Sequence, residues 1–197
     1  MDRRLLKAEN VIFDIGRVLI EFKMEYVAKQ MLPMRLFKYV KEPFFLDQWL
    51  QLDAGTTTST ESSKLICATY NLQGDEALFK NLMDNFCEVC SPLPLSSTIT
   101  ELQKAGKKVY LLTNYGEEAF KSSKKYYPFL QAANGEVVSA VEKVCKPDEE
   151  IYKILLDRYN IDPSTAVYID DKLENIKAAR KLNIDSIWYP LEYNDFA

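Results

Sequence analysis

The chain has 197 residues, 47% of them hydrophobic and 12% aromatic, and a formal net charge of −4 at pH 7. This composition supports one globular domain, or a core domain with a small insertion, and excludes a disordered chain. Basic residues are scattered, which argues against a nucleic-acid-binding protein, and no apolar run approaches the length of a membrane span. The start resembles a signal peptide, but Lys7, Glu9 and Asn10 cut its apolar part short, so we expect a soluble cytoplasmic protein.

Histidine is absent from the sequence. Its absence excludes Ser-His-Asp hydrolysis, Cys-His proteolysis and zinc or haem sites with histidine ligands. Cys87 and Cys90 have the spacing of a redox pair or of half a zinc site. A zinc site with four cysteines would also need the distant Cys67 and Cys145, so buried free thiols are the favoured interpretation.

The first predicted strand lies in the apolar run at residues 11–20, which Asp14 and then Gly16 interrupt. Apolar neighbours on both sides suit a strand buried on both faces, so Asp14 marks the point where the strand passes into a loop. In a parallel sheet with helices on both faces, ligands bind at the carboxyl ends of the strands. A glycine there lets the backbone approach a ligand closely. The alternative is a core strand that ends in a turn with a capping aspartate.

Residues 22–90 are predicted to be helical, with no clear strand. The apolar spacing predicts helical segments over residues 22–40 with a break at Pro33, and a further helix that ends at residues 53–55. Thr58 and Glu61 are spaced as a capping box, and Asp75 is expected to cap the helix after it. We therefore predict a helical insertion at residues 22–90, between the two parts of a core formed by residues 1–21 and 91–197.

From residue 91 onwards, helices and strands alternate. Helices are predicted around residues 97–104, 116–127, 148–159 and 173–182, and strands at residues 108–112, 136–139, 166–169 and 186–188. This alternation predicts an α/β fold with a parallel sheet.

Charged side chains follow two of the predicted strands at the same relative point. Asp14 follows the first strand, and Asp170 and Asp171 follow the strand at residues 166–169. Lys146 precedes a helix and could reach the same edge of the sheet. Carboxylates packed together repel each other unless a cation lies between them, and oxygen ligands without His or Cys favour magnesium. A magnesium ion beside a lysine is typical of a phosphate site.

Thr113 and Asn114 follow the predicted strand at residues 108–112 and would lie at the same edge. Their hydroxyl and amide groups would donate hydrogen bonds to phosphate oxygens. Taken singly, each of these polar residues has a simpler explanation as a turn or helix-cap residue. Their coincidence at three strand ends favours a site.

These segments resemble the motifs of the haloacid dehalogenase-like superfamily of aspartate-nucleophile hydrolases, in its branch with a helical cap between the first two motifs. The matching segments are residues 13–19, 111–114, 146–159 and 168–175. Residues 49–55 are similar to the cap of a subgroup that acts on sugar phosphates. The resemblance covers nearly the whole chain, and it implies a doubly wound, Rossmann-like core with the inserted cap at residues 22–90.

The resemblance also implies a magnesium-dependent phosphatase in which Asp14 attacks phosphorus and forms an aspartyl phosphate, which water then hydrolyses. It assigns magnesium to four residues, Asp14, Gly16 through its carbonyl, Asp171, and Asp170 in an assisting role. It assigns the phosphate oxygens to three others, Thr113, Asn114 and the catalytic Lys146, whereas Asn175 orients the loop. The expected substrate is a small phosphorylated metabolite of the sugar phosphate class, and the expected assembly is a monomer or weak homodimer.

Gly16 departs from the commonest pattern of the superfamily, in which a second aspartate two residues after the nucleophile is the general acid and base. The glycine form resembles a subgroup similar to bacterial glucose-1-phosphate phosphatases. An alternative is a capped fold with weak or no catalysis that binds a metabolite or partner. A phospho-acceptor signalling domain is disfavoured because its acidic pair normally precedes the phosphorylated aspartate, and a dehalogenase because it has no need of the acidic pair.

Overall fold

A single parallel sheet of five strands forms the centre of the computed structural model, which describes residues 3–190. The strand order is β3-β2-β1-β4-β5. The strands are β1 (Asn10–Phe13), β2 (Lys108–Thr113), β3 (Gly135–Val138), β4 (Ala166–Asp170) and β5 (Asp185–Trp188). Phe13 of the central strand pairs with Leu111 of β2 and Ile169 of β4, so these three strands end at nearly the same level. The predicted doubly wound α/β fold is confirmed.

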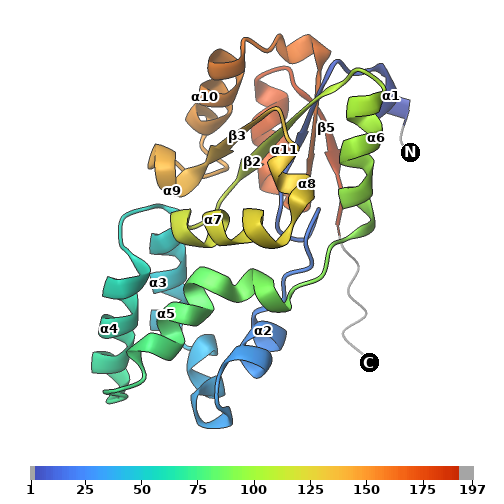
Figure 1. Cartoon of the computed structure of the whole chain (residues 1–197). Helices are drawn as coiled ribbons and strands as arrows, with labels where there is room; N and C mark the ends of the chain where they lie inside the picture. Colours follow the sequence, from blue (N-terminus) through green and yellow to red (C-terminus); the bar gives the residue numbers. More distant parts are fainter. Residues whose placement is uncertain (1–2, 191–197) are drawn as a thin grey trace.

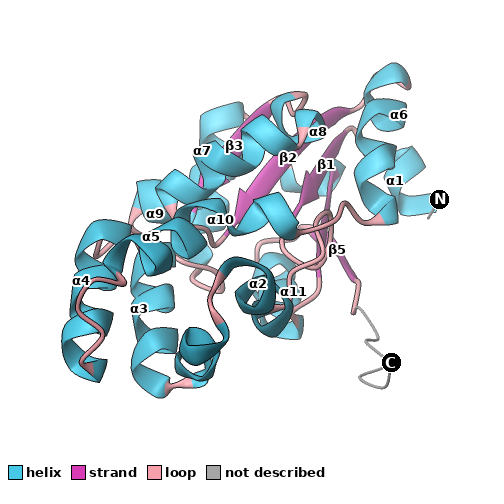
Figure 2. Ribbon diagram, turned by 60° about the horizontal axis from the view of Figure 1, so that its bottom comes forward, coloured by secondary structure: helices cyan, strands magenta, loops and turns pink. Residues whose placement is uncertain are grey.

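Helices cover both faces of the sheet (Figure 2). Val11 and Phe13 pack into one apolar cluster and Ile12 into the other, as expected for a strand that is buried on both faces. The first cluster includes α6 (Thr98–Lys104), α7 (Glu117–Tyr126) and α8 (Pro128–Gln131). The second includes α10 (Glu149–Tyr159) and α11 (Leu173–Lys181).

Four short helical segments complete the core. The first, α1, had not been predicted, and it precedes β1. A strand had been predicted to reach Ser139, but β3 ends at Val138 and a short helix begins at Ser139. The four segments are α1 (Arg3–Lys7), η3 (Pro94–Ser97), α9 (Ser139–Glu142) and η4 (Pro163–Thr165).

Residues 22–90, between β1 and β2, form a group of helices at one end of the sheet (Figure 1). We call residues 22–90 the cap segment. Its helices are α2 (Met24–Met31), η1 (Met34–Lys41), α3 (Pro43–Asp53), α4 (Ser59–Tyr70), α5 (Glu76–Asn85) and η2 (Phe86–Val89). The prediction of helices without strands is confirmed for this segment, and the helical path breaks at Pro33 as expected. Phe45, Ile66 and Phe79 continue the first apolar cluster into the cap segment.

The two connections between core and cap segment are hydrogen-bonded to each other. The Glu21 N–H donates to the Ser91 carbonyl at 2.8 Å, and the Leu93 N–H donates to the Leu19 carbonyl at 2.8 Å. Ile20 and Pro92 form an isolated bridge between these bonds. The predicted boundaries, at residues 21/22 and 90/91, fall on this pair of connections. The division into two domains stays a prediction.

Two predicted helix caps have different outcomes. The capping box is present, since the Glu61 N–H donates to Thr58 Oγ1 at 3.2 Å and the Thr58 N–H donates to Glu61 Oε2 at 3.0 Å. Asp75 occupies the N-cap position of α5, but its side chain makes no cap hydrogen bond, so that part of the prediction was wrong. Both Asp75 oxygens instead accept hydrogen bonds from Arg35, at 2.5 and 2.6 Å, which joins η1 to α5.

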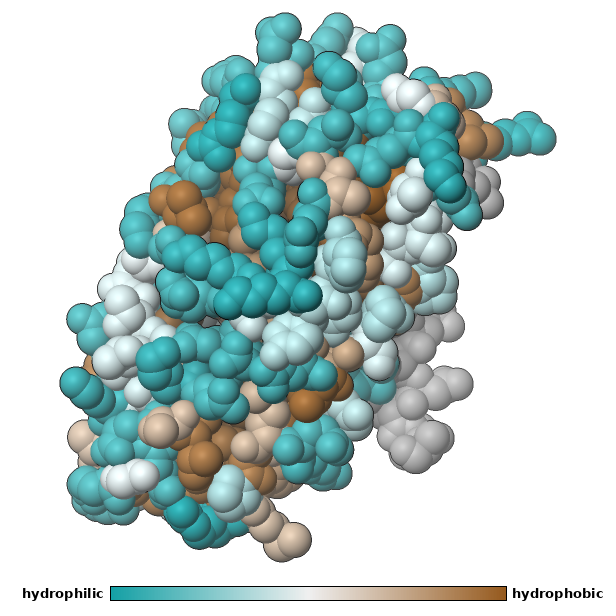
Figure 3. Space-filling model, in the orientation of Figure 1, coloured by the Kyte–Doolittle hydropathy of each residue, from teal (hydrophilic) through white to brown (hydrophobic). Residues whose placement is uncertain are grey.

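The face seen in Figure 3 is mostly hydrophilic, with hydrophobic atoms in separate patches. Within residues 3–190, every helix is too short or too polar to cross a lipid bilayer. All four cysteines are free thiols. Cys67 and Cys87 are buried, as the favoured interpretation expected, whereas Cys90 and Cys145 are half-buried.

Candidate active site

The predicted site residues meet at the carboxyl edge of the sheet. Asp14 directly follows β1, Thr113 ends β2 and Asp170 ends β4. Carboxylate oxygens of Asp14, Asp170 and Asp171 lie within 4.8 Å of one another. The parallel register explains this convergence, because β1 pairs with β2 on one side and with β4 on the other.

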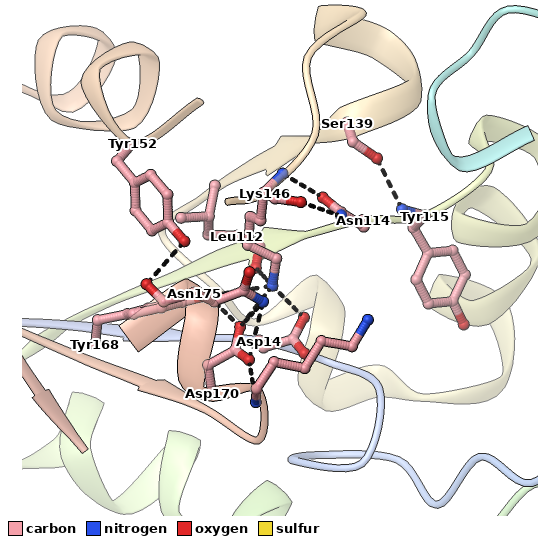
Figure 4. Close-up of polar contacts among 11 residues, drawn as sticks. Asp14, Leu112, Asn114, Tyr115, Ser139, Lys146, Tyr152, Tyr168, Asp170 and Asn175 are labelled. Carbon is pink, nitrogen blue, oxygen red and sulfur yellow. Dashed lines mark hydrogen bonds and ion pairs between the residues drawn. The ribbon is translucent and has the colours of Figure 1, made fainter. Parts of the chain in front are cut away.

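Lys146 lies between two of these carboxylates (Figure 4). Its Nζ is 2.8 Å from Asp14 Oδ1 and 2.8 Å from Asp170 Oδ2, and it donates to the Leu112 carbonyl at 2.9 Å. The side chain is 2% exposed. Burial lowers the pKa of Lys146, but the charges of Asp14 and Asp170 outweigh this effect and raise it above the ordinary value. Lys146 is therefore a fixed positive charge beside the predicted nucleophile.

Asp170 is fully buried, and protein donors hold both of its oxygens. Asn175 Nδ2 lies 3.0 Å from each oxygen, and the Lys172 N–H donates to Oδ1 at 2.8 Å. The Tyr168 hydroxyl donates to Oδ2. Burial raises the pKa of Asp170, but Lys146 and these hydrogen bonds outweigh it and lower the pKa below its usual value. Asp170 thus stays ionised and orients Lys146, whereas its expected assisting role in magnesium binding stays a prediction.

Tyr168 had not been assigned a role, although its position carried a signal. It lies two residues before Asp170 on β4, and side chains two apart in a strand point to the same face. Asn175 was expected to orient the loop, and its direct contact is with Asp170. Its carbonyl in turn accepts a hydrogen bond from the Tyr152 hydroxyl at 3.1 Å.

For Asp14 and Asp171, neighbouring charges and hydrogen bonds do not outweigh the effect of burial on the pKa, as they do for Asp170. Burial raises the pKa of Asp14 to about 6, although Lys146 acts in the opposite direction. Burial, and then repulsion by Asp170, raises the pKa of Asp171, whose Oδ2 is 3.3 Å from Arg17 Nε. Each carboxylate has one cation beside it, yet its pKa stays raised, and two such carboxylates close together fit a hard divalent cation with oxygen ligands. Magnesium therefore suits Asp14 and Asp171, and Gly16 lines the same cavity.

Asn114 holds the backbone of Lys146. Its Nδ2 donates to the Lys146 carbonyl at 2.9 Å, and the Lys146 N–H donates to Asn114 Oδ1 at 2.8 Å. Thr113 is buried, and both residues line the cavity. Asn114 therefore positions the backbone of Lys146. The predicted contacts of Thr113 and Asn114 with phosphate stay predictions.

A cavity of about 550 Å³ opens beside these groups. All the predicted site residues except the fully buried Asp170 line it. The cap segment and the β1 loop supply apolar side chains, Ile20, Phe22, Trp49, Leu50 and Phe86. The three aromatic rings form a cluster, with centroid distances of 5.6 Å for Phe22–Trp49, 5.0 Å for Phe22–Phe86 and 5.3 Å for Trp49–Phe86.

Asp53, at the end of α3, also lines this cavity. The sequence had identified it as the end of a helix and as part of residues 49–55, the segment similar to the cap of a subgroup that acts on sugar phosphates, and had given it no role of its own. Nothing in the local pattern indicated that it would line the same cavity as Asp14, because the two residues come to one cavity only through the folding of the cap segment onto the core.

Comparison with known proteins identifies the family. A sequence model of the haloacid dehalogenase-like hydrolases matches residues 9–183. The chain belongs to this family, abbreviated HAD-like below.

Two curated relatives of this HAD-like chain match over shorter stretches. The sesquiterpene phosphatase astK of Aspergillus oryzae is 30% identical over 90 residues, which are 46% of this chain and 46% of that protein. Acyl-CoA dehydrogenase family member 10 of Mus musculus is 31% identical over 94 residues, 47% of this chain and 9% of that protein. The aligned stretch is thus less than half of either relative.

Solved structures share the HAD-like fold over most of the chain. The HAD family enzyme BT-2542 of Bacteroides thetaiotaomicron has a TM-score of 0.75 at 21% identity, covering 95% of this chain and 96% of that one. The same enzyme in complex with magnesium and inorganic phosphate has a TM-score of 0.72 at 22% identity, covering 92% and 93%. L-2-haloacid dehalogenase of Xanthobacter autotrophicus has a TM-score of 0.67 at 15% identity, covering 91% and 76%. At these identities the likeness concerns the fold alone.

Proposed function

We propose that the protein is a magnesium-dependent phosphomonoesterase whose nucleophile is Asp14. The observation that carries this proposal is the convergence of Asp14, Lys146 and Asp171 at one end of a cavity large enough for a small organic phosphate. The phosphatase activity of the Aspergillus oryzae relative and the magnesium and phosphate complex of the Bacteroides thetaiotaomicron enzyme support it.

In the proposed reaction, an Asp14 oxygen attacks phosphorus and the bond to the leaving alcohol breaks, which gives an aspartyl phosphate. Lys146 neutralises charge as the two anions approach, and Asp170 keeps it in place. Asp14, Asp171 and the Gly16 carbonyl would hold magnesium, which screens the charge of the phosphate when bound. Water then hydrolyses the aspartyl phosphate and regenerates Asp14.

The aromatic cluster bears on the substrate class. A sugar phosphate was expected from the resemblance and stays a prediction, as does the subgroup similar to glucose-1-phosphate phosphatases. A sugar needs a hydrogen-bonding partner for each buried hydroxyl, and the rings of Phe22 and Phe86 have none to offer. The lining therefore favours a phosphomonoester with an apolar organic group. Full burial of such a group of side-chain size contributes roughly 1.5–3 kcal/mol.

A matched pair of esters tests both parts of the proposal. Cyclohexylmethyl phosphate and glucose 6-phosphate are similar in size and differ in their hydroxyl groups. With magnesium, we expect kcat/KM to be at least about 10-fold higher for the apolar ester, because about 1.4 kcal/mol corresponds to tenfold. A preference for the sugar phosphate would contradict the substrate class and leave the phosphatase proposal intact.

The alternative is a binding protein with little turnover, which the missing carboxylate at Gly16 favours. It predicts that inorganic phosphate binds in calorimetry while neither ester is hydrolysed. A monomer or weak homodimer in the cytoplasm, which acts on a small phosphorylated metabolite and does not bind nucleic acid or membrane, stays part of the proposal. Light scattering tests the assembly.

A further inference from the structure

Position 16 leaves open space beside the nucleophile. Apart from its chain neighbours, a Cβ atom built on Gly16 would have no heavy atom within 4 Å, and Gly16 lines the cavity with Asp14. The backbone at this position thus borders open space, into which a longer side chain could extend. A leaving alcohol and an attacking water both need a proton-transfer group here.

Few side chains around the cavity can transfer a proton to the leaving alcohol or from the attacking water. Within residues 3–190 the titratable side chains that line the cavity, besides Asp14, Lys146 and Asp171, are Arg17, Asp53, Tyr115, Cys145 and Lys172. Arg17 and Lys172 are cations, and a cation cannot take a proton from the attacking water. Burial raises the pKa of Tyr115 well above its usual value, and it also raises the pKa of the Cys145 thiol. Asp53 is the remaining carboxyl group.

The backbone of Asp53 is fastened to the core. Its carbonyl accepts hydrogen bonds from Ser139 Oγ and from Cys145 Sγ, the latter at 3.7 Å. Gly55 has φ +65°, and a Cβ there would lie 2.1 Å from the Ala140 carbonyl oxygen, so only glycine permits this close approach. The Gly55 carbonyl accepts a hydrogen bond from Lys143 Nζ. The end of α3 is thus tied to the loop that also carries Lys146.

Charged groups from several elements face the Asp53 carboxyl group. The pKa of Asp53 is raised to about 8, chiefly by burial and to a smaller extent by the charge of Asp14. The charges of Lys172 and Lys146 and a backbone hydrogen bond from Gly116 act in the opposite direction. A carboxyl group with a raised pKa can hold a proton near neutral pH and donate it to a leaving oxygen.

We propose that Asp53 is the general acid and base of the reaction, in place of the side chain that Gly16 lacks. This inference rests on the proposed phosphatase function. As Asp14 attacks phosphorus and the bond to the leaving oxygen breaks, the Asp53 carboxyl proton passes to that oxygen and releases the alcohol. The Asp53 carboxylate then takes a proton from water as the water oxygen attacks the aspartyl phosphate. Cleavage of the bond between phosphorus and Asp14 releases inorganic phosphate, and Asp53 is protonated again.

The test uses Asp53→Asn with two esters that differ in their need for protonation. General acid catalysis contributes about 10²–10⁴-fold. For cyclohexylmethyl phosphate we expect kcat/KM to fall at least about 100-fold in the variant. In the wild-type protein kcat/KM should decline as pH rises through about 8, and in the variant this decline should be absent. For 4-nitrophenyl phosphate, whose leaving group needs no proton, kcat/KM should fall less than about 10-fold. Its kcat should fall more, with a burst of nitrophenol equal to the enzyme concentration, because the aspartyl phosphate now hydrolyses slowly.

Two further variants complete the design. Asp47→Asn changes an exposed aspartate of the same helix, and Asp47 does not line the cavity. This variant should hydrolyse both esters with unchanged kcat/KM. Gly16→Asp in the Asp53→Asn background should restore turnover of the alkyl ester. Equal losses of kcat/KM on both esters, without a burst or rescue, would overturn the role of Asp53. A wild-type protein that hydrolyses neither ester would instead overturn the phosphatase function itself.

Discussion

Replacing Lys146 with methionine should lower the free energy of unfolding by about 3–5 kcal/mol, because it leaves buried carboxylates without their cation. At an effective dielectric constant of about 20, opposite charges separated by the 2.8 Å of the Lys146–Asp170 pair attract by about 6 kcal/mol, and the cost of burying the lysine offsets part of this. Methionine keeps the length of the side chain and removes the charge. Urea denaturation in EDTA, followed by circular dichroism, measures the change without bound magnesium.

Lys121→Met is the matched control. Lys121 also contacts two carboxylates, Glu117 and Glu118, each at 2.8 Å, but its side chain is 53% exposed. Exposed ion pairs contribute little to stability, so this variant should lose far less unfolding free energy than Lys146→Met. Equal losses for Lys146→Met and Lys121→Met would refute the argument from burial.

The loss in Lys146→Met should depend on pH. Burial already raises the pKa of Asp14 to about 6, and removal of the lysine charge raises it further. A carboxyl group whose pKa is higher in the folded than in the unfolded state opposes folding where it is ionised, and this effect vanishes below its unfolded pKa. The deficit relative to the wild-type protein should therefore be smaller at pH 5 than at pH 8. A constant deficit would contradict the assignment of the effect to Asp14 and Asp170.

Three other outcomes follow from the site and the cap segment. Asp14→Asn should abolish turnover and leave the melting temperature within a few degrees, and residual activity near the wild-type rate would exclude Asp14 as nucleophile. Calcium should support turnover poorly in place of magnesium, since its larger, looser coordination shell misplaces the attacking oxygen; equal rates in a metal-replacement assay would contradict this. Thr58→Ala should cost about 1 kcal/mol of unfolding free energy through loss of the capping box, and denaturation with no change would show that the cap contributes nothing.

The part of the site that could be predicted is the part built on strands. Asp14, Thr113 and Asp170 each end a run of buried apolar residues, and parallel pairing dictates that such ends meet. Contacts that depend on the folding of the cap segment left no trace in the local pattern. Asp75 follows the rule for an N-cap residue, but Arg35, 40 residues away in sequence, takes both its oxygens. Asp53 ends a helix like many other aspartates, and only tertiary structure brings it to the cavity.

The pair of hydrogen bonds between residues 19–21 and 91–93 makes the cap segment an insertion whose two ends meet. For the sheet, the 69 residues of this segment are one long loop closed at its base. Because the entropy cost of closing a loop grows only slowly with its length, the core can accept inserts of very different size at this junction. The size and polarity of the group that the cavity admits can therefore diverge between relatives by exchange of the insert, while Asp14, Lys146 and Asp171 keep their positions.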